Sequence, residues 1–153
     1  DLGQLYLVAV DTQDDSSALG GFCEKRAAHL RSLLAAAAGR PTLVFAHHPP
    51  VTLPDMKEPS LQYREVNDAA RLVDCLQSCP ELVGVVTGHV HRTRSVPLGA
   101  VTLSTVPSIA ADLSREKSGD TYLRRPIYQV HTWENGKLKT ASVALEASDY
   151  VKA

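Results

Sequence analysis

The chain has 153 residues, 44% hydrophobic and 22% charged, an ordinary globular composition that excludes disorder and coiled coil. Its net charge of −1 provides no basic surface for a nucleic acid polymer or an anionic membrane. No apolar run approaches the roughly 20 residues that a membrane-spanning helix needs.

Strands and helices alternate in the first ninety residues of the sequence. Apolar runs predict strands over 5–10, 42–46 and 82–86. Helical spacing of apolar residues predicts a helix over about 22–38 and a second from its N-cap Asn67 to Ser78. This alternation predicts an α/β fold.

The rest of the chain is loop and β structure. The prolines of 49–65 exclude a regular helix and predict a structured loop over a site, and the charged stretch 112–120 is expected to be mobile. Asn135-Gly136 is the strongest hairpin signal between two β-rich runs. Four further strands are expected over 93–96, 100–105, 127–133 and 138–145.

Four of the six histidines follow two of the apolar strands directly. His47 and His48 come after 42–46, and His89 and His91 come after 82–86. Ligand sites of open α/β sheets lie at the carboxyl ends of the strands, and imidazole is a preferred ligand of zinc, iron and manganese. The two clusters are therefore expected to converge on one metal site.

The remaining histidines and the cysteines predict no further site. His29 and His131 are expected to be ordinary surface or satisfied core residues. The three cysteines are an odd number, and Cys75 and Cys79 are spaced for packing on one face of a helix. This cysteine usage predicts a reduced, cytoplasmic protein.

Several segments together resemble the calcineurin-like metallophosphoesterases, in the branch of class III cyclic-nucleotide phosphodiesterases and bacterial glycerophosphodiesterases. Their order and spacing agree along nearly the whole chain. The segments are Leu7-Val8-Ala9-Val10-Asp11-Thr12 with the helix that follows, Phe45-Ala46-His47-His48-Pro49-Pro50-Val51, Gly88-His89-Val90-His91-Arg92 and Ser104-Thr105-Val106-Pro107-Ser108.

Other motifs of that family are missing from the sequence. The family's Asp-x-His, Gly-Asp-x-x-Asp and Gly-Asn-His-Asp motifs, which supply the remaining ligands and the bridging carboxylate, have no counterpart. The resemblance therefore implies that residues 1–153, as a single domain or fragment, form the C-terminal half of a four-layer αββα sandwich with a mixed sheet. The start at Asp1 without a methionine also fits a fragment.

The resemblance implies a dinuclear metal centre that hydrolyses a phosphoester. His47 and His89 would bind one divalent ion and His91 the other, with manganese, iron or zinc as candidates. The substrate would be a small phosphoester: a phosphodiester such as a cyclic nucleotide or a glycerophosphodiester in the first place, with a phosphomonoester as the other option. A missing N-terminal half would complete the site, so the chain alone is expected to be inactive.

The roles of the neighbouring polar residues stay open at this point. His48 is either a packing neighbour of the ligands or a substrate contact, and Arg92 either meets a phosphate oxygen or faces solvent. Asp11 is expected to cap local backbone. Gln62, Tyr63 and Ser108 lie on segments that could overhang a substrate, although such residues are usually turn or surface residues.

Two alternatives belong to other functional classes. One is a catalytically inactive, truncated module that serves binding or assembly. The other is a mononuclear zinc hydrolase in which His47, His89 and His91 hold one ion. A half sandwich would also leave an apolar face exposed, which predicts a homo-oligomer or association with the missing N-terminal half.

Overall fold

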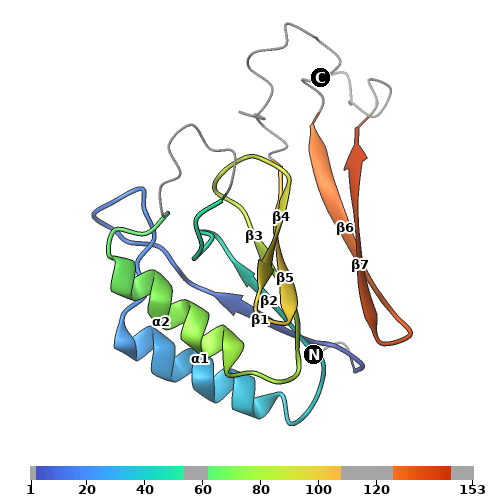
Figure 1. Ribbon diagram of the computed structural model, residues 1–153, viewed down its shortest axis with the longest axis horizontal. Coiled ribbons are helices and arrows are strands. Elements are labelled where there is room, and N and C mark those ends of the chain that lie inside the picture. The colour runs from blue at the N-terminus through green and yellow to red at the C-terminus, as the bar shows by residue number, and fades with distance from the viewer. Residues whose placement is uncertain (1–2, 54–61, 108–125, 146–153) are drawn as a thin grey trace, which may run out of the picture.

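Four parallel strands form the centre of the computed structural model, which describes residues 3–53, 62–107 and 126–145 (Figure 1). The five-stranded sheet has the order β1-β2-β3-β5-β4, and only β4 runs antiparallel, paired with β5. Its strands are β1 (Tyr6–Val10), β2 (Thr42–Ala46), β3 (Leu82–Thr87), β4 (Arg94–Leu98) and β5 (Val101–Thr105). The expected α/β class with a mixed sheet is confirmed.

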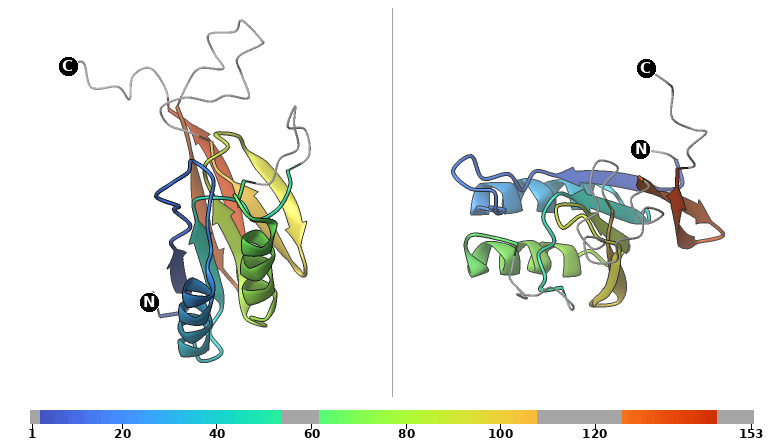
Figure 2. Two further views of the ribbon diagram at one scale, coloured as in Figure 1. Left: turned by 90° about the vertical axis from the view of Figure 1, so that its left-hand side faces the viewer. Right: turned by 90° about the horizontal axis from the view of Figure 1, so that it is seen from above.

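Two helices, α1 (Glu24–Ala36) and α2 (Val66–Gln77), cover one face of this sheet (Figure 2). Leu72 and Leu76 lie one turn apart on α2 and are fully buried, because their spacing keeps both on the side that faces the sheet. They join Val8, Val44 and Val85 of the central strands in the main core. This core holds β2 and β3 in place, and with them the positions of their carboxyl ends.

A hairpin of β6 (Ile127–Glu134) and β7 (Lys137–Ala144) lies on the opposite face of the sheet. Trp133 and Leu138 pack there against a small cluster of Leu5, Leu43 and Val86. The turn uses Asn135 and Gly136 at φ of 51° and 73°, the left-handed conformations that the Asn-Gly dipeptide predicts. The predicted hairpin is confirmed.

The observed strands and helices lie within two residues of the predicted ranges, with one correction at a helix start. Asn67 is not the N-cap of α2, because the extended residue Glu65 is the cap and the helix begins at Val66. The predicted packing of Cys75 and Cys79 in the core is confirmed, since both are buried and free. The charged stretch 112–120 lies outside the described residues, as do residues 54–61 of the proline-rich loop.

None of the helices in the described ranges is both long and apolar enough to cross a bilayer.

Candidate metal centre

The ends of β2 and β3 bring the two histidine clusters together. Ala46 and Thr87 are partners in the parallel register, so the residues that follow them leave the sheet side by side. The Gly88 N–H donates to the His47 carbonyl at 2.9 Å, which extends the pairing by one step beyond the strands. The two strand ends therefore lie side by side, as predicted, although the predicted convergence does not bring His91 into the group of close ring nitrogens.

Three imidazoles meet at this edge. Ring nitrogens of His47, His48 and His89 lie within 4.8 Å of one another, and His47 Nε2 and His89 Nδ1 are 3.3 Å apart. His47 is exposed, His89 is half-buried and His48 is buried. His91 lies outside this group, although it shares the turn with His89.

The turn that carries His89 and His91 is conformationally strained. His89 and His91 have φ of 65° and 50°, a left-handed conformation that costs about 1–2 kcal/mol for a residue with a Cβ. Val90, between them, is buried in the main core, and its N–H donates to the Gly88 carbonyl at 2.8 Å. Packing of Val90 thus holds two histidines in a conformation that local preference would not select.

Burial favours the neutral form of two of the clustered imidazoles. Desolvation, followed by the neighbouring histidines His48, His47 and His91, lowers the pKa of His89 to about 4. Burial also lowers the pKa of His48. A neutral imidazole carries a free lone pair, which is the form that binds a metal ion.

The geometry of His47 and His89 fits a shared metal ion. Two nitrogens that bind one tetrahedral ion at about 2.0–2.1 Å are about 3.3–3.4 Å apart, which matches the observed 3.3 Å. Imidazole suits zinc, iron and related ions. The group of three contains no carboxylate among the described residues, so any carboxylate ligand of such an ion would come from elsewhere.

Two polar atoms near the strand ends have no partner within the described residues. These are Nδ1 of His91 and Nε of Arg92, and both are buried. An unpaired buried polar atom is costly in a folded protein and indicates a missing ligand or neighbour. Arg92 also accepts a hydrogen bond at its carbonyl from the Thr105 hydroxyl, which ties the segment to β5.

His48 is fully engaged with the protein. Its Nδ1 lies 2.9 Å from Thr12 Oγ1 and its Nε2 lies 3.1 Å from the Ala18 carbonyl. The hydroxyl of Tyr63 donates to the His48 carbonyl at 3.1 Å. Gly20 packs against the ring so closely that a Cβ there would lie 2.8 Å from His48 Cγ.

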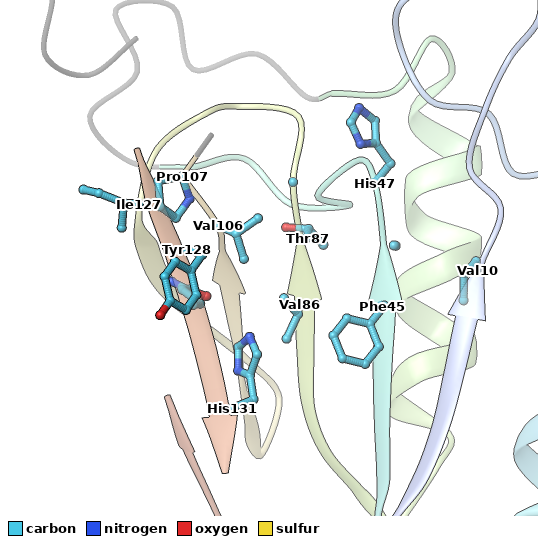
Figure 3. Close-up of a pocket in the computed structure, with 13 residues that line it drawn as sticks. Val10, Phe45, His47, Val86, Thr87, Val106, Pro107, Ile127, Tyr128 and His131 are labelled. Atoms are coloured by element: carbon cyan, nitrogen blue, oxygen red, sulfur yellow. The ribbon is translucent and has the colours of Figure 1, made fainter. Parts of the chain in front are cut away.

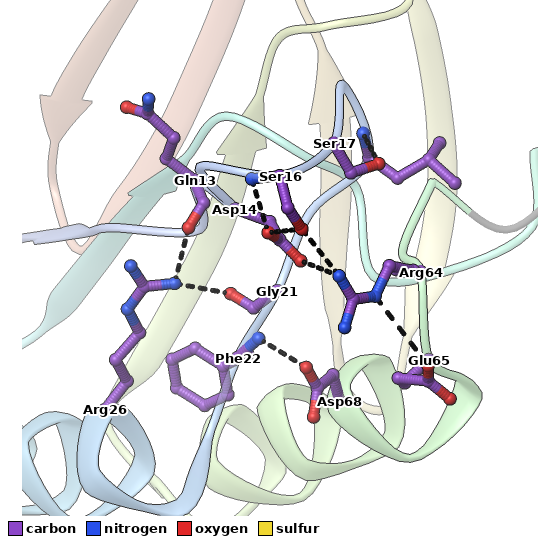
Figure 4. A network of polar contacts seen from close by, with 11 residues as sticks. Gln13, Asp14, Ser16, Ser17, Gly21, Phe22, Arg26, Arg64, Glu65 and Asp68 are labelled. Atoms are coloured by element: carbon purple, nitrogen blue, oxygen red, sulfur yellow. Dashed lines mark hydrogen bonds and ion pairs between the residues drawn. The ribbon is translucent and has the colours of Figure 1, made fainter.

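The loop that supplies Thr12 and Ala18 is held by an arginine of α1 (Figure 4). Arg26 donates to the carbonyls of Gln13 at 2.7 Å and Gly21 at 2.8 Å, and it pairs with Asp11 at 2.8 Å. One guanidinium therefore joins both ends of the loop. Asp11 also accepts a hydrogen bond from the Gln13 N–H, so its predicted backbone-capping role is confirmed.

A second arginine holds the middle of the same loop. Arg64 donates to the Ser16 hydroxyl at 2.6 Å and pairs with Asp14 at 3.3 Å, while Asp14 accepts from both the N–H and the hydroxyl of Ser16. The backbone of Gly20 bonds to residues 62 and 64 on either side. The loop is thus anchored to the segment that follows the proline-rich stretch.

The structure places the other candidate residues away from any open substrate surface. Gln62 and Tyr63 are both buried, and burial raises the pKa of the Tyr63 hydroxyl. Ser108 lies outside the described residues. Sequence reasoning missed Thr12, whose buried hydroxyl contacts His48 across 36 positions of the chain. Only its place at the end of an apolar strand pointed to it.

A cavity of about 540 Å³ lies beside His47, between the sheet and the hairpin (Figure 3). His47 stands at one end of it, while Phe45 and His131 meet edge to face with ring centroids 6.3 Å apart. Its lining is mainly apolar and includes Val10, Val86, Val106 and Ile127. The candidate metal site therefore borders an apolar face that the hairpin covers only in part.

The curated relatives of this chain include two glycerophosphodiester phosphodiesterases. The chain is 25% identical over 133 residues to a probable glycerophosphodiester phosphodiesterase GpdQ of Arcobacter nitrofigilis, covering 84% of this chain and 48% of that protein. It is 28% identical over 102 residues to the glycerophosphodiester phosphodiesterase GpdQ of Enterobacter lignolyticus. This match covers 67% of this chain and 36% of that protein. The chain thus spans about half the length of the curated relatives it matches, or less.

Two further comparisons complete this result. A dimetal phosphatase from Danio rerio aligns with 57% of this chain and 27% of its own, at a TM-score of 0.46 and 20% identity. No protein-family profile matches the chain. Taken with the histidine motifs at the ends of β2 and β3, the curated relatives relate this chain to the metallophosphoesterase superfamily.

Proposed function

We propose that this chain forms part of a metal-dependent phosphoesterase that acts on a small phosphodiester, such as a glycerophosphodiester or a cyclic nucleotide. The observation that carries the proposal is the 3.3 Å separation of His47 Nε2 and His89 Nδ1 at two neighbouring parallel strand ends. It is supported by glycerophosphodiester phosphodiesterases among the relatives.

In this proposal His47 and His89 hold one divalent ion and His91 helps to hold a second. Manganese, iron and zinc are the candidates, and the bound ions would stabilise negative charge on the phosphoryl oxygens. The buried, unpaired Nδ1 of His91 supports its assignment, because a ligand would satisfy it. Arg92 follows His91 directly, and its Nε is also buried and unpaired among the described residues. It is the candidate for contacting a phosphate oxygen.

We further propose that the carboxylate ligands come from a second half of the domain. The described cluster is made of imidazoles alone, and the relatives are about twice as long as the matched region. The apolar cavity beside His47 offers a surface against which such a half would pack. Residues 1–153 are then the C-terminal half of the catalytic domain.

The test is an activity assay with and without the complementary half. We expect the 153-residue chain to bind Mn²⁺, Fe²⁺ or Zn²⁺ weakly and to hydrolyse bis(p-nitrophenyl) phosphate poorly or not at all. Fusing the part of the Arcobacter nitrofigilis relative that this chain does not match should raise both metal affinity and turnover. Robust turnover by the chain alone would contradict the need for a second half.

A binding or assembly module without catalysis is the second candidate, favoured by the lack of a carboxylate in the described cluster. A well-folded, completed protein that hydrolyses no phosphoester with any of the three metals would support it. The three-histidine zinc alternative is less well supported, because His91 lies outside the group of converging nitrogens. Metal stoichiometry separates it from a dinuclear centre.

A further inference from the structure

The buried histidine beside the candidate metal ligands has both ring nitrogens engaged by the protein. Ring nitrogens of His48 lie within 4.8 Å of those of His47 and His89, so distance alone would make His48 a third ligand. Its hydrogen bonds argue against this. Nδ1 is 2.9 Å from the Thr12 hydroxyl, and Nε2 is 3.1 Å from the Ala18 carbonyl.

The Ala18 carbonyl decides where the proton of a neutral His48 sits. A carbonyl oxygen can only accept, so His48 Nε2 must carry the hydrogen and donate it to Ala18. Nδ1 is then the bare nitrogen and must accept. The hydroxyl of Thr12, 2.9 Å away, is the donor that reaches it, and the same oxygen accepts separately from the His48 N–H at 3.2 Å.

The same contacts make a charged ring unfavourable. The ring contacts described for His48 are to a hydroxyl, a carbonyl and other aromatic rings, and none of them is to a carboxylate. A buried imidazolium there would have no counter-charge. Nε2 thus carries the proton and the lone pair of Nδ1 accepts from Thr12, which leaves no nitrogen free to bind an ion.

The ring still touches both candidate ligands. Its centroid lies 4.7 Å from that of His47, nearly perpendicular to it, and 4.5 Å from that of His89. Its other side rests on Gly20, which leaves no space for a Cβ. His48 is therefore held between the anchored loop and the two imidazoles.

We propose that Thr12 and His48 are positioning residues: Thr12 fixes His48 as the Nε2–H tautomer, and the locked ring orients His47 and His89 without binding metal. This inference deepens the proposed metal site and rests on it for its functional consequence. It assigns Thr12 a role that the strand-end motif does not suggest. It also removes His48 from the ligand set that proximity would give.

The first test reads the tautomer directly in the full 153-residue chain, labelled with ¹⁵N and kept free of metal with a chelator. Long-range ¹H–¹⁵N correlation should show His48 with a protonated Nε2 and a bare Nδ1, assigned by the loss of those signals in His48→Gln. Addition of Zn²⁺ after removal of the chelator should change the ring signals of His47 and His89 and leave the His48 tautomer as it was. A His48 protonated at Nδ1, or one whose nitrogens become zinc-bound, would overturn the inference.

The second test uses a matched pair of variants at position 12. Thr12→Val keeps the shape and removes the hydroxyl, so the Nδ1 signal of His48 should shift and Zn²⁺ affinity should fall about 10-fold, as for loss of an outer hydrogen-bond partner. Thr12→Ser should restore both. Unchanged Nδ1 signal and Zn²⁺ affinity in a folded Thr12→Val chain would overturn the role of Thr12.

Failure of the proposed metal site would look different. A chain that binds no Zn²⁺ would contradict the metal proposal, whereas the tautomer and the Thr12→Val and Thr12→Ser signals are read without metal. If Thr12→Val does not fold, the wild-type tautomer and the Thr12→Ser variant still decide the inference.

Discussion

His47 Nε2 and His89 Nδ1 lie 3.3 Å apart, although 42 positions separate the two residues in the chain. The parallel pairing of β2 with β3 brings them together. The hydrogen bond from the Gly88 N–H to the His47 carbonyl keeps the two segments side by side just beyond the strands. Val90, buried in the core, holds the turn in which His89 sits. The spacing of the two imidazoles is therefore a consequence of the sheet and its core.

This spacing predicts that His47 and His89 contribute to metal binding together. Replacing either by alanine should lower Zn²⁺ affinity by at least about 10-fold, since even outer-shell partners of a metal contribute that much. His29→Ala is the matched control, because His29 is an exposed histidine on α1. Isothermal titration calorimetry measures the Zn²⁺ affinity of the three variant chains. Equal affinity in the His47→Ala, His89→Ala and His29→Ala chains would exclude the site.

Gly20 should tolerate no side chain. A Cβ at Gly20 would lie 2.8 Å from Cγ of the His48 ring, which is fixed by hydrogen bonds at both nitrogens. We expect Gly20→Ala to destabilise the protein by about 1–3 kcal/mol, the usual cost of overpacking. Gly21→Ala is the matched control, because its Cβ would meet Asp14 at an ordinary 3.4 Å. Urea unfolding of the two variants should separate them, and equal midpoints would contradict the close packing.

The fold could be predicted from the sequence because its signals are local. Apolar runs fixed the three parallel strands of the first ninety residues, and the Asn135-Gly136 turn fixed the hairpin. The start of α2 was less predictable, since Asn67 is a good cap by residue type while the observed cap, Glu65, lies two residues earlier. Helix boundaries depend on tertiary contacts, such as the hydrogen bond of 2.8 Å that the Phe22 N–H donates to the Asp68 carboxylate.

The candidate site could be predicted only in part. Two histidine pairs at strand ends indicated that His47 and His89 would meet, because parallel strands end at one edge. The surroundings of His48 were not predictable, since Thr12 reaches it from a loop 36 positions away. Nothing in residue type distinguishes that threonine from a surface one. The separation of His91 from the group of three likewise depends on the left-handed turn.

His131 should make stability depend on pH. Burial lowers its pKa in the folded chain below the ordinary value of about 6.5. The unfolded chain therefore binds more protons between the two pKa values, so the contribution of His131 is complete above about pH 6.5 and is lost as pH falls. His131→Phe keeps a ring against Phe45 and removes the titration. Urea unfolding is measured with a chelator present. When the pH is lowered from about 7.5 to about 5, the urea midpoint should fall more for the wild type than for His131→Phe. Parallel falls would contradict this.

Arg26 should control the order of the loop that carries Thr12 and Ala18. Its guanidinium donates to the carbonyls of Gln13 and Gly21, so removing it leaves two backbone acceptors at the loop ends without that partner. Hydrogen bonds to charged groups contribute about 1.5–3 kcal/mol, and the side chain of Arg26 is 34% exposed, so we expect Arg26→Met to cost about 1 kcal/mol.

The matched control for this change is Arg31→Met on the same helix. Arg31 forms its ion pair with Glu24 at 2.9 Å, where both side chains are largely exposed, so its removal should change stability by less than about 0.5 kcal/mol. Hydrogen exchange should show faster exchange of the amides of Gly20 and Gly21 in Arg26→Met and unchanged exchange in Arg31→Met. Because Gly20 also supports the His48 ring, the same Arg26→Met chain should bind Zn²⁺ more weakly than the control. Identical exchange and affinity in the two variants would show that the loop keeps its order without Arg26.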